Sequence, residues 1–598
     1  MAITSSSSSF YVNCSIEKRP SYVSHNNSHH HHFNIIPFPS AFKQKMMMIG
    51  LPEFPKIVAS PTVRLVDACV DSFFEFIDQP LLPTQSNFAP VEELGAAMVV
   101  TNNIQGHIPH GFPEGVYIRN GPNPLFGGLK STNSIFGKTN HIWVEGEGML
   151  HALYFKKSSS NHNNQDNNKW TVLYNNRHVE TETYNLEKQR NKPSFLPAIH
   201  GDSLAILFAY LLNLIRFGKV NKYISNTNVF EHSGKFYSVA ESHIPQEIDI
   251  FTLKTLRNWD LNGAWNRPFC SHPKKAPGSG NLVTLGMSPT LPFCELGIIS
   301  ADGKKLVHKV DLKLNRCSLC HELGVTRRYN VIMDFPLTID LLRLVKGEQL
   351  IRYDKHEYAR IGVMPRYGDA SSIKWFEVEP NCTFHIINSF EQGHEVVVRG
   401  CRSLDSLIPG PDPSSNELDC LSRCYEWRLN MKTGEVKERN LMRGKQVYMD
   451  FPMVNENFIG IKNRYAYTQL VAPLATSTQG VLKYGGLAKL YFEESSSEEL
   501  SMQGEKEHKE DPIRVEYHMF EKNTFCSGAA FVPKDGALEE DDGWIISFVH
   551  NEDNATSQVH IIDGKKLCGE TVAKITLPCR VPYGFHGAFM PISFQGTR

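Results

Sequence analysis

The 598-residue chain has no excess of charge of either sign. It contains 62 lysines and arginines against 63 aspartates and glutamates, which gives a formal net charge of −1, and no basic stripe is visible. A nucleic-acid-binding protein would show such an excess or stripe, so nucleic acid is not expected as a partner. The apolar stretch at 203–215 is also shorter than the roughly 20 residues that a membrane-spanning helix needs.

Several common functional motifs are missing as well. The chain has no Gly-x-Ser-x-Gly elbow, no phosphate-binding loop and no dinucleotide fingerprint. Its 13 cysteines are scattered along the sequence, unlike the disulfide framework of a small secreted domain. Cys317-Ser318-Leu319-Cys320-His321 fits a covalent haem pattern or half of a zinc site, but no second CxxC completes a zinc site. We expect Cys317 and Cys320 to pack in a strand.

The N-terminal segment 1–45 has the composition of a targeting peptide. It is rich in serine, notably at 5–9, and Glu17 is its only acidic residue. Such serine-rich, acid-poor segments are typical of organelle transit peptides, which predicts a plastid protein, with a cytoplasmic location as the alternative. The histidine run at 29–32 can bind metal, but an unstructured or disordered segment is favoured. We therefore exclude 1–45 from the fold.

Two apolar segments predict helices. Apolar residues recur at helical spacing within 54–80, which indicates an amphipathic helix. The segment 203–219 is apolar almost all round until Arg216 and Lys219. It is either a core helix or a helix that dips into one face of a membrane without crossing it.

Most of the chain from about Ile108 onward has an all-β pattern. Short strands such as 115–119, 236–240 and 395–399 alternate with turn signals of the type Ser233-Gly234. Many short strands of this kind indicate a closed all-β architecture, either a propeller or a barrel. The polar inserts 158–168 and 493–511 are predicted to be exposed loops.

Four isolated histidines stand out within this pattern. Each lies at the end of a hydrophobic segment, and the intervals between them are 49, 64 and 201 residues: His272, His321, His385 and His586. No two can share a helical turn, so they could meet only if separate strands brought them together. Each alone is also compatible with an ordinary hydrogen-bonded core histidine.

These histidine segments, together with Arg119-Asn120-Gly121-Pro122-Asn123-Pro124 and Glu145-Gly146-Glu147-Gly148-Met149-Leu150-His151, resemble the carotenoid cleavage dioxygenase family. The resemblance covers about 88–589, and the plant branch is the most similar. It implies a seven-bladed β-propeller domain over 88–598, with a few helices that cap its top face and form an apolar, membrane-facing patch. The acids Glu145 and Glu147 lie between glycines and are expected to shape a turn, not to act as an acid–base pair.

The resemblance also implies a metal site. His272, His321, His385 and His586 would hold Fe(2+), and imidazole ligands suit such an ion. A ligand histidine needs an acceptor for its other ring nitrogen. Glu241 and Asp450 match two of the family's three carboxylates in that role, whereas Gly528 occupies the place of the third.

The implied reaction is the oxidative cleavage of a conjugated C=C bond of a carotenoid or apocarotenoid by dioxygen. Cleavage at 9,10(9′,10′) is favoured, and 13,14 cleavage of an apocarotenal is the alternative. Isomerisation or stilbene cleavage on the same scaffold, and a catalytically weak propeller that binds lipids, remain as rival hypotheses.

Overall fold

The computed structural model describes residues 61–594, apart from 80, 82, 158–169, 407, 409–417, 474–481 and 494–511. The described residues belong to one compact unit, Glu53–Arg598. The predicted targeting segment 1–45 and the insert at 158–168 lie outside them, as does all but the start of the insert at 493–511.

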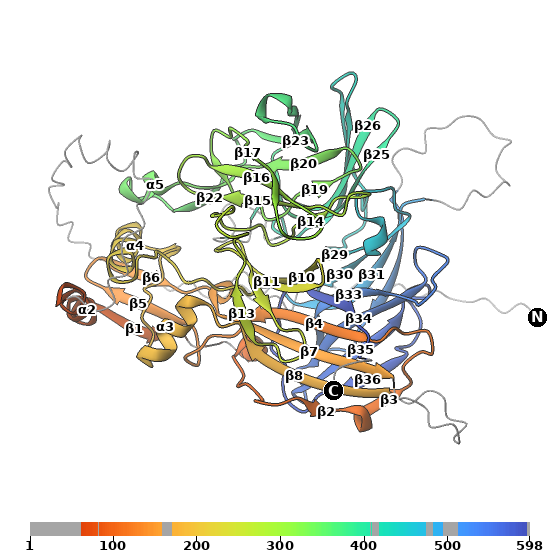
Figure 1. The fold of residues 1–598 in the computed structure, drawn as a ribbon, viewed down its shortest axis with the longest axis horizontal. Coiled ribbons are helices and arrows are strands. Elements are labelled where there is room, and N and C mark those ends of the chain that lie inside the picture. The colour runs from red at the N-terminus through yellow and green to blue at the C-terminus, as the bar shows by residue number, and fades with distance from the viewer. Residues whose placement is uncertain are drawn as a thin grey trace, which may run out of the picture. The chain divides into compact units, whose positions relative to one another are not determined.

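Seven groups of four or five antiparallel strands account for most of the described residues (Figure 1). The first group joins both ends of the domain: β2 (Met98–Val99), β8 (Trp170–His178), β7 (Gly148–Lys157), β4 (Gly115–Pro122) and β37 (Gly587–Pro591). In it, the C-terminal strand β37 pairs with β4, so that Gly587 lies opposite Arg119. The end of the domain therefore completes a sheet that its beginning started.

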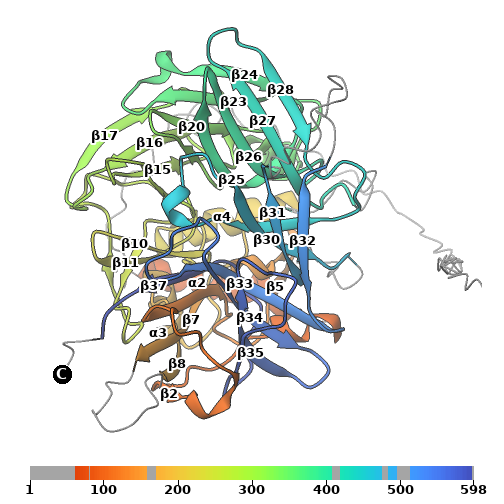
Figure 2. The same cartoon turned by 90° about the vertical axis from the view of Figure 1, so that its right-hand side faces the viewer.

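The next four groups follow in chain order, each from an inner to an outer strand (Figures 1 and 2). They are β10 (Asn228–His232), β11 (Lys235–Val239), β12 (Gln246–Ile248) and β13 (Thr255–Asn258); β14 (Lys274–Lys275), β15 (Leu282–Met287), β16 (Cys294–Ile299) and β17 (Leu306–Asp311); β19 (Gly324–Val325), β20 (Tyr329–Asp334), β23 (Ala359–Pro365) and β24 (Lys374–Val378); β25 (Cys382–Gln392), β26 (Glu395–Ser403), β27 (Arg423–Asn430) and β28 (Val436–Asn440).

The last two groups are linked by a single residue pair, Tyr484 with Cys526. They are β29 (Met449–Met453), β30 (Tyr465–Val471), β31 (Tyr484–Tyr491) and β32 (Arg514–Met519); and β33 (Thr524–Pro533), β34 (Gly543–Asn551), β35 (Thr556–Asp563), β36 (Ala573–Thr576) and β3 (Ile104–Gly106). These seven groups are the blades of a propeller. The predictions of an all-β propeller and of strands at 115–119, 236–240 and 395–399 are confirmed.

Turn chemistry and apolar packing explain this arrangement locally. The Ser233-Gly234 loop between β10 and β11 has φ values of 57° and 75°. Two positive φ angles give a hairpin turn whose twist matches that of the strands, and glycine adopts one without strain. Neighbouring blades then bury their apolar faces together, as Leu296 of β16 and Ile332 of β20 do in one cluster.

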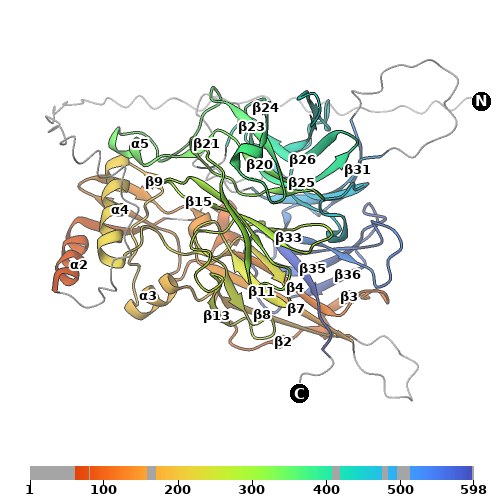
Figure 3. The ribbon, with the colours of Figure 1, turned by 45° about the horizontal axis from the view of Figure 1, so that its top comes forward.

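Two small sheets and the helices lie outside the blades. The sheets are β1 (Phe74–Asp78), β5 (Lys130–Ser134), β6 (Gly137–Asn140) and β9 (His200–Gly201); and β18 (Cys317–Ser318), β21 (Leu337–Ile339) and β22 (Ile351–Tyr353). The helices are α2 (Pro61–Phe73), α3 (Glu182–Arg190), α4 (Ser203–Phe217) and α5 (Leu341–Val345). Figure 3 shows α2 beside α4. An ion pair joins the two helices, with Nε of Arg216 in α4 2.7 Å from Oδ1 of Asp67 in α2.

The helix expected over 54–80 is shorter in the structure. Helix α2 ends at Phe73, and Phe74–Asp78 forms strand β1, which pairs with β5. Phe74, Glu75 and Phe76 alternate apolar and acidic side chains, a period of two that suits a strand at a sheet edge. Residues 54–60 lie outside the described residues.

Helix α4 has two different apolar faces. Ala205, Ile206 and Ala209 are buried, whereas Leu204, Leu211 and Ile215 on the opposite side are 57%, 40% and 54% exposed. Gly218 ends the helix at a φ of 67°, a left-handed conformation that glycine adopts readily. None of the helices that the structure describes is both long and apolar enough to cross a membrane.

Candidate metal centre

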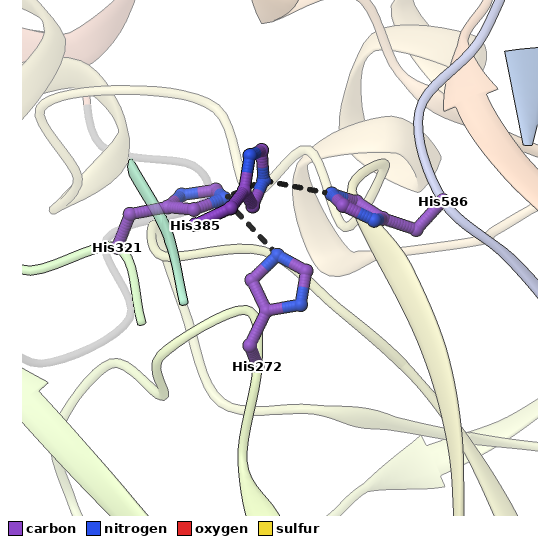
Figure 4. A group of neighbouring side chains, drawn as sticks. All are labelled: His272, His321, His385 and His586. Atoms are coloured by element: carbon purple, nitrogen blue, oxygen red, sulfur yellow. Dashed lines mark hydrogen bonds between the residues drawn. The ribbon is translucent and has the colours of Figure 1, made fainter. Parts of the chain in front are cut away.

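The inner strands of four blades bring the four predicted histidines to one point (Figure 4). His272 precedes β14, His321 precedes β19, His385 lies in β25, and His586 directly precedes β37. One ring nitrogen of each lies within 4.8 Å of one ring nitrogen of every other. The four histidines, which are far apart in the sequence, therefore meet in the folded structure.

The spacing of these nitrogens suits a single bound ion. The Nε2 atoms of His272 and His321 are 3.1 Å apart, those of His321 and His385 are 3.2 Å apart, and those of His385 and His586 are 3.1 Å apart. Two imidazole nitrogens bound at about 2.1 Å and at right angles to each other lie about 3.0 Å apart. The observed distances match that arrangement.

Carboxylates hold the other ring nitrogen of two of these histidines. Nδ1 of His385 donates to Oδ1 of Asp450 at 2.7 Å, and Nδ1 of His321 contacts Oε1 of Glu241. With its proton on Nδ1, each neutral ring presents a lone pair at Nε2. The Nε2 atoms of His321 and His385, which lie 3.2 Å apart, are thus the nitrogens that could bind a cation.

The surroundings shift the pKa values of three of the four histidine rings. Burial, together with the neighbouring histidines, holds the pKa values of His272 and His586 well below their usual range, so both rings are neutral. Burial opposes the charged form of His321 too, but the Glu241 carboxylate outweighs burial and raises the pKa of that ring. Four imidazole donors, two of them backed by carboxylates, fit a ferrous ion well.

Asp450 matches the predicted role despite its short side chain. Besides His385, it accepts hydrogen bonds from the backbone N–H of Phe451 at 2.8 Å and from Oγ of Ser422 at 3.1 Å. Burial raises the pKa of Asp450, but His385 outweighs burial and lowers it overall. The carboxylate is thus ionised and fixed in place.

The place of the third carboxylate contains an arginine side chain. Gly528 has a φ of 65°, and a Cβ atom at that residue would collide with Cγ of Arg119. Arg119 is 1% exposed, and its guanidinium donates to the carbonyl of Pro582 at 2.5 Å and to Oγ of Ser527 at 3.3 Å. Burial lowers the pKa of Arg119 to about 10. Arg119 thereby braces the loop that leads to His586.

Two aromatic residues beside the ligands were not predicted. The Phe384 ring lies 5.6 Å from the His321 ring, and the Phe451 ring lies 4.6 Å from the His586 ring and 5.1 Å from the His385 ring, measured between centroids. Phe384 adjoins a predicted ligand in sequence, which is a usable signal. No sequence signal marks Phe451, whose contacts depend on a left-handed backbone with a φ of 53°.

A cavity of about 1050 Å³ reaches three of the histidines, His272, His385 and His586. Its walls also carry charged groups, among them Lys274 and Glu322, which form an ion pair. This space is therefore accessible to water and to small polar molecules.

The remaining motif residues have structural roles. Glu147 pairs with Lys222 at 2.7 Å, and Oε2 of Glu145 accepts from the backbone N–H of Ile142 at 3.0 Å, in agreement with the predicted turn. Cys317 and Cys320 are buried free thiols, and burial raises the pKa of Cys317 to about 12. Cys320 donates to the carbonyl of Met333 at 2.9 Å.

Comparisons with known proteins agree with this geometry. Residues 88–591 match the family described as retinal pigment epithelial membrane protein. A carotenoid 9,10(9′,10′)-cleavage dioxygenase 1 of Pisum sativum is 32% identical over 89% of this chain and 94% of that protein. A 9-cis-epoxycarotenoid dioxygenase of Oryza sativa subsp. japonica, named chloroplastic, is 27% identical over 96% of this chain and 93% of that protein.

A solved structure shares the fold. The crystal structure of a Pseudomonas brassicacearum lignostilbene dioxygenase covers 86% of this chain and 100% of its own, with a TM-score of 0.68 and 20% identity. The resemblance inferred from the motifs is thus confirmed. The chain belongs to the family of the retinal pigment epithelial membrane protein, alongside the plant carotenoid cleavage dioxygenases.

Proposed function

We propose that this protein is a non-haem Fe(II) dioxygenase that cleaves a conjugated C=C bond of a carotenoid or apocarotenoid. His272, His321, His385 and His586 hold the ferrous ion. The observation that carries the proposal is the convergence of four imidazole nitrogens, with Nδ1 of His321 and of His385 each held by a carboxylate. A set of imidazole donors of this kind suits a bound transition-metal ion.

The protein's own residues orient the ligands and shape the site. Glu241 and Asp450 keep the protons of His321 and His385 on Nδ1, which leaves Nε2 free to bind. A ferrous ion held by these four imidazoles would supply the redox chemistry that activation of dioxygen needs. The Phe384 and Phe451 rings pack on His321 and His586 and add apolar surface beside them, which suits a polyene.

The favoured bond is 9,10(9′,10′), because the pea relative is named for that cleavage. Cleavage at 13,14 of an apocarotenal is the alternative. Product identification from a C40 carotenoid and a C27 apocarotenal, incubated side by side, separates the two.

The activity is tested with labelled dioxygen. Incorporation of label into both carbonyl products supports dioxygenation, whereas isomerised substrate without label would support an isomerase. Stilbenes assayed in parallel show whether the substrate is instead a stilbene. His385→Ala should lose both the bound iron and the activity. A purified protein without iron or turnover, but with bound lipid, would support a lipid-binding propeller instead.

The exposed face of α4 is proposed to rest on a membrane surface. Leu204, Leu211 and Ile215 lie on that face, and Leu65 of the adjacent helix α2 is 66% exposed. Apolar side chains of this kind enter the boundary between headgroups and acyl chains without spanning the bilayer. Such contact would give the site access to a substrate that is dissolved in lipid.

The protein is proposed to act in the plastid. The composition of 1–45 and the chloroplastic name of the rice relative support this location. A fluorescent protein fused to residues 1–45 should enter plastids, and a cytosolic signal would refute the proposal.

A further inference from the structure

The four histidines are not held in the same way. His321 and His385 each place Nδ1 on a carboxylate, and the amide of Asn228 lies 3.5 Å from Nδ1 of His272. Among the described residues, none forms a hydrogen bond with Nδ1 of His586. An imidazole without such a hydrogen bond can turn about its bond to Cβ, so packing against a neighbouring side chain would restrict it.

The backbone around His586 is fixed, but this does not set the ring. The His586 N–H donates to the carbonyl of Thr227 at 3.3 Å, and its carbonyl accepts from the N–H of Asn120 at 3.2 Å. Arg119 binds the same loop through Pro582 at 2.5 Å. These contacts place the Cα atom of His586 and leave the ring orientation to side-chain packing.

Phe451 supplies that packing. Its ring is tilted by 37° to the His586 ring, with the centroids 4.6 Å apart. Of the aromatic rings on described residues that contact His586, the others belong to the ligands His272 and His385. Phe451 is therefore the aromatic side chain from outside the ligand set that packs on this ring among the described residues.

The backbone of Phe451 indicates that its position is imposed. A bulky residue with a φ of 53° is an outlier, and such conformations persist only where the surroundings enforce them. The Asp450 carboxylate accepts from the Phe451 N–H at 2.8 Å, and the Tyr484 ring packs on Phe451 at 5.3 Å. The residue that orients His385 thus also holds the ring that lies on His586.

We propose that Phe451 is a positioning residue that orients the His586 ring by packing against it, in place of the carboxylate that Gly528 cannot supply. The inference rests on the proposed function, because it concerns the ion that the four histidines would hold. It assigns to an aromatic ring the task that hydrogen bonds perform at His321 and His385.

The test compares the rate of iron loss to a chelator in the Fe(II)-loaded full-length protein, under anaerobic conditions. Phe451→Ala should lose iron about tenfold faster or more, as is typical when a residue that supports a ligand is removed. Phe451→Tyr keeps the ring and should stay close to the wild type. The visible spectrum of the Co(II)-substituted protein should change in Phe451→Ala and not in Phe451→Tyr.

Phe384→Ala is the matched control. Phe384 also packs on a ligand, but that ligand, His321, is oriented by Glu241. Its removal should therefore change iron loss far less than Phe451→Ala does. Equal effects of the two variants would show that the apolar surroundings matter in general, and would overturn a specific role of Phe451.

A second variant keeps the test valid if Phe451→Ala fails to fold. Phe451→Gly removes the ring and relieves the positive φ, so it should fold even if Phe451→Ala does not. Iron loss at the wild-type rate in either folded variant would overturn the inference alone. A wild-type protein that binds no iron would instead overturn the proposed function.

Discussion

Asp450 accepts a hydrogen bond from Nδ1 of His385 at 2.7 Å while its other oxygen accepts from Ser422 at 3.1 Å. One carboxylate thus fixes a ligand tautomer and is itself fixed. Although aspartate is one methylene shorter than glutamate, its position in β29 brings it within reach of His385 in β25.

Removal of the Asp450 carboxylate should weaken iron binding. We expect Asp450→Ala to lower the affinity for Fe(II) by about 10- to 100-fold. Asp450→Asn keeps an acceptor oxygen and should cost less. Ser422→Ala, which removes only the supporting contact, should have the smallest effect. Metal titration in competition with a chelator measures this order, and equal affinities for Asp450→Ala and the wild type would contradict it.

Gly528 should not tolerate a side chain. A Cβ atom on Gly528 would collide with Arg119, and the φ of Gly528 is positive. Gly536 has a similar φ of 71°, but no atom lies near the position of its Cβ atom. Gly536→Ala should cost about 1–2 kcal/mol for the backbone conformation alone. Gly528→Ala should cost about 1–3 kcal/mol more through the collision. Thermal unfolding of the two variants gives the comparison, and similar midpoints would show that Arg119 moves aside freely.

Glu145 should make stability depend on pH. Burial raises its pKa to about 7 from an ordinary value near 4.5. The folded state therefore keeps a proton that the unfolded state releases first. The stabilisation is fully present below about pH 4.5 and is lost as the pH rises through 7, by up to about 3 kcal/mol. Glu145→Gln should flatten this dependence and raise the unfolding midpoint at pH 8 relative to the wild type. An unchanged pH profile would contradict the prediction.

The exposed side of α4 should determine vesicle binding. Substitution of Leu204, Leu211 and Ile215 by serine should reduce cosedimentation with lipid vesicles by about tenfold or more, because burial of each side chain contributes over 1 kcal/mol. Turnover of detergent-dissolved substrate should stay the same. Leu538 is 95% exposed and lies far from α4 in sequence, so Leu538→Ser is the control. Equal losses of binding in both variants would exclude a specific surface.

The sequence predicted the four histidines that converge, but not everything that orients them. The four histidines, Glu241 and Asp450 could be found because each lies in a recognisable local motif. Phe451 could not be found, since its role depends on a left-handed backbone and on the packing of strands from different blades. Gly528 was identified as a departure, but the side chain that fills the space, Arg119, lies more than 400 residues earlier in the chain.

The same holds for the secondary structure, where features set by adjacent residues could be predicted and a pairing between distant segments could not. Hairpin turns such as Ser233-Gly234 are encoded by two residues and were predicted correctly. The helix predicted over 54–80 includes the residues of β1, because the apolar residues of the whole segment fit a helical period. Its part Phe74-Glu75-Phe76, however, alternates with a period of two. The partner of β1 is β5, about 55 residues further on, and no local pattern shows that pairing.

The pairing of β37 with β4 has a consequence for the order of assembly during translation. His586 is synthesised last of the four ligands, and the strand that follows it is the one that closes the first blade. When the chain has emerged only as far as β36, three of the four histidines and every blade strand except β37 have been synthesised. A chain that ended just before residue 586 would therefore lack both the fourth imidazole and the strand that completes the first blade.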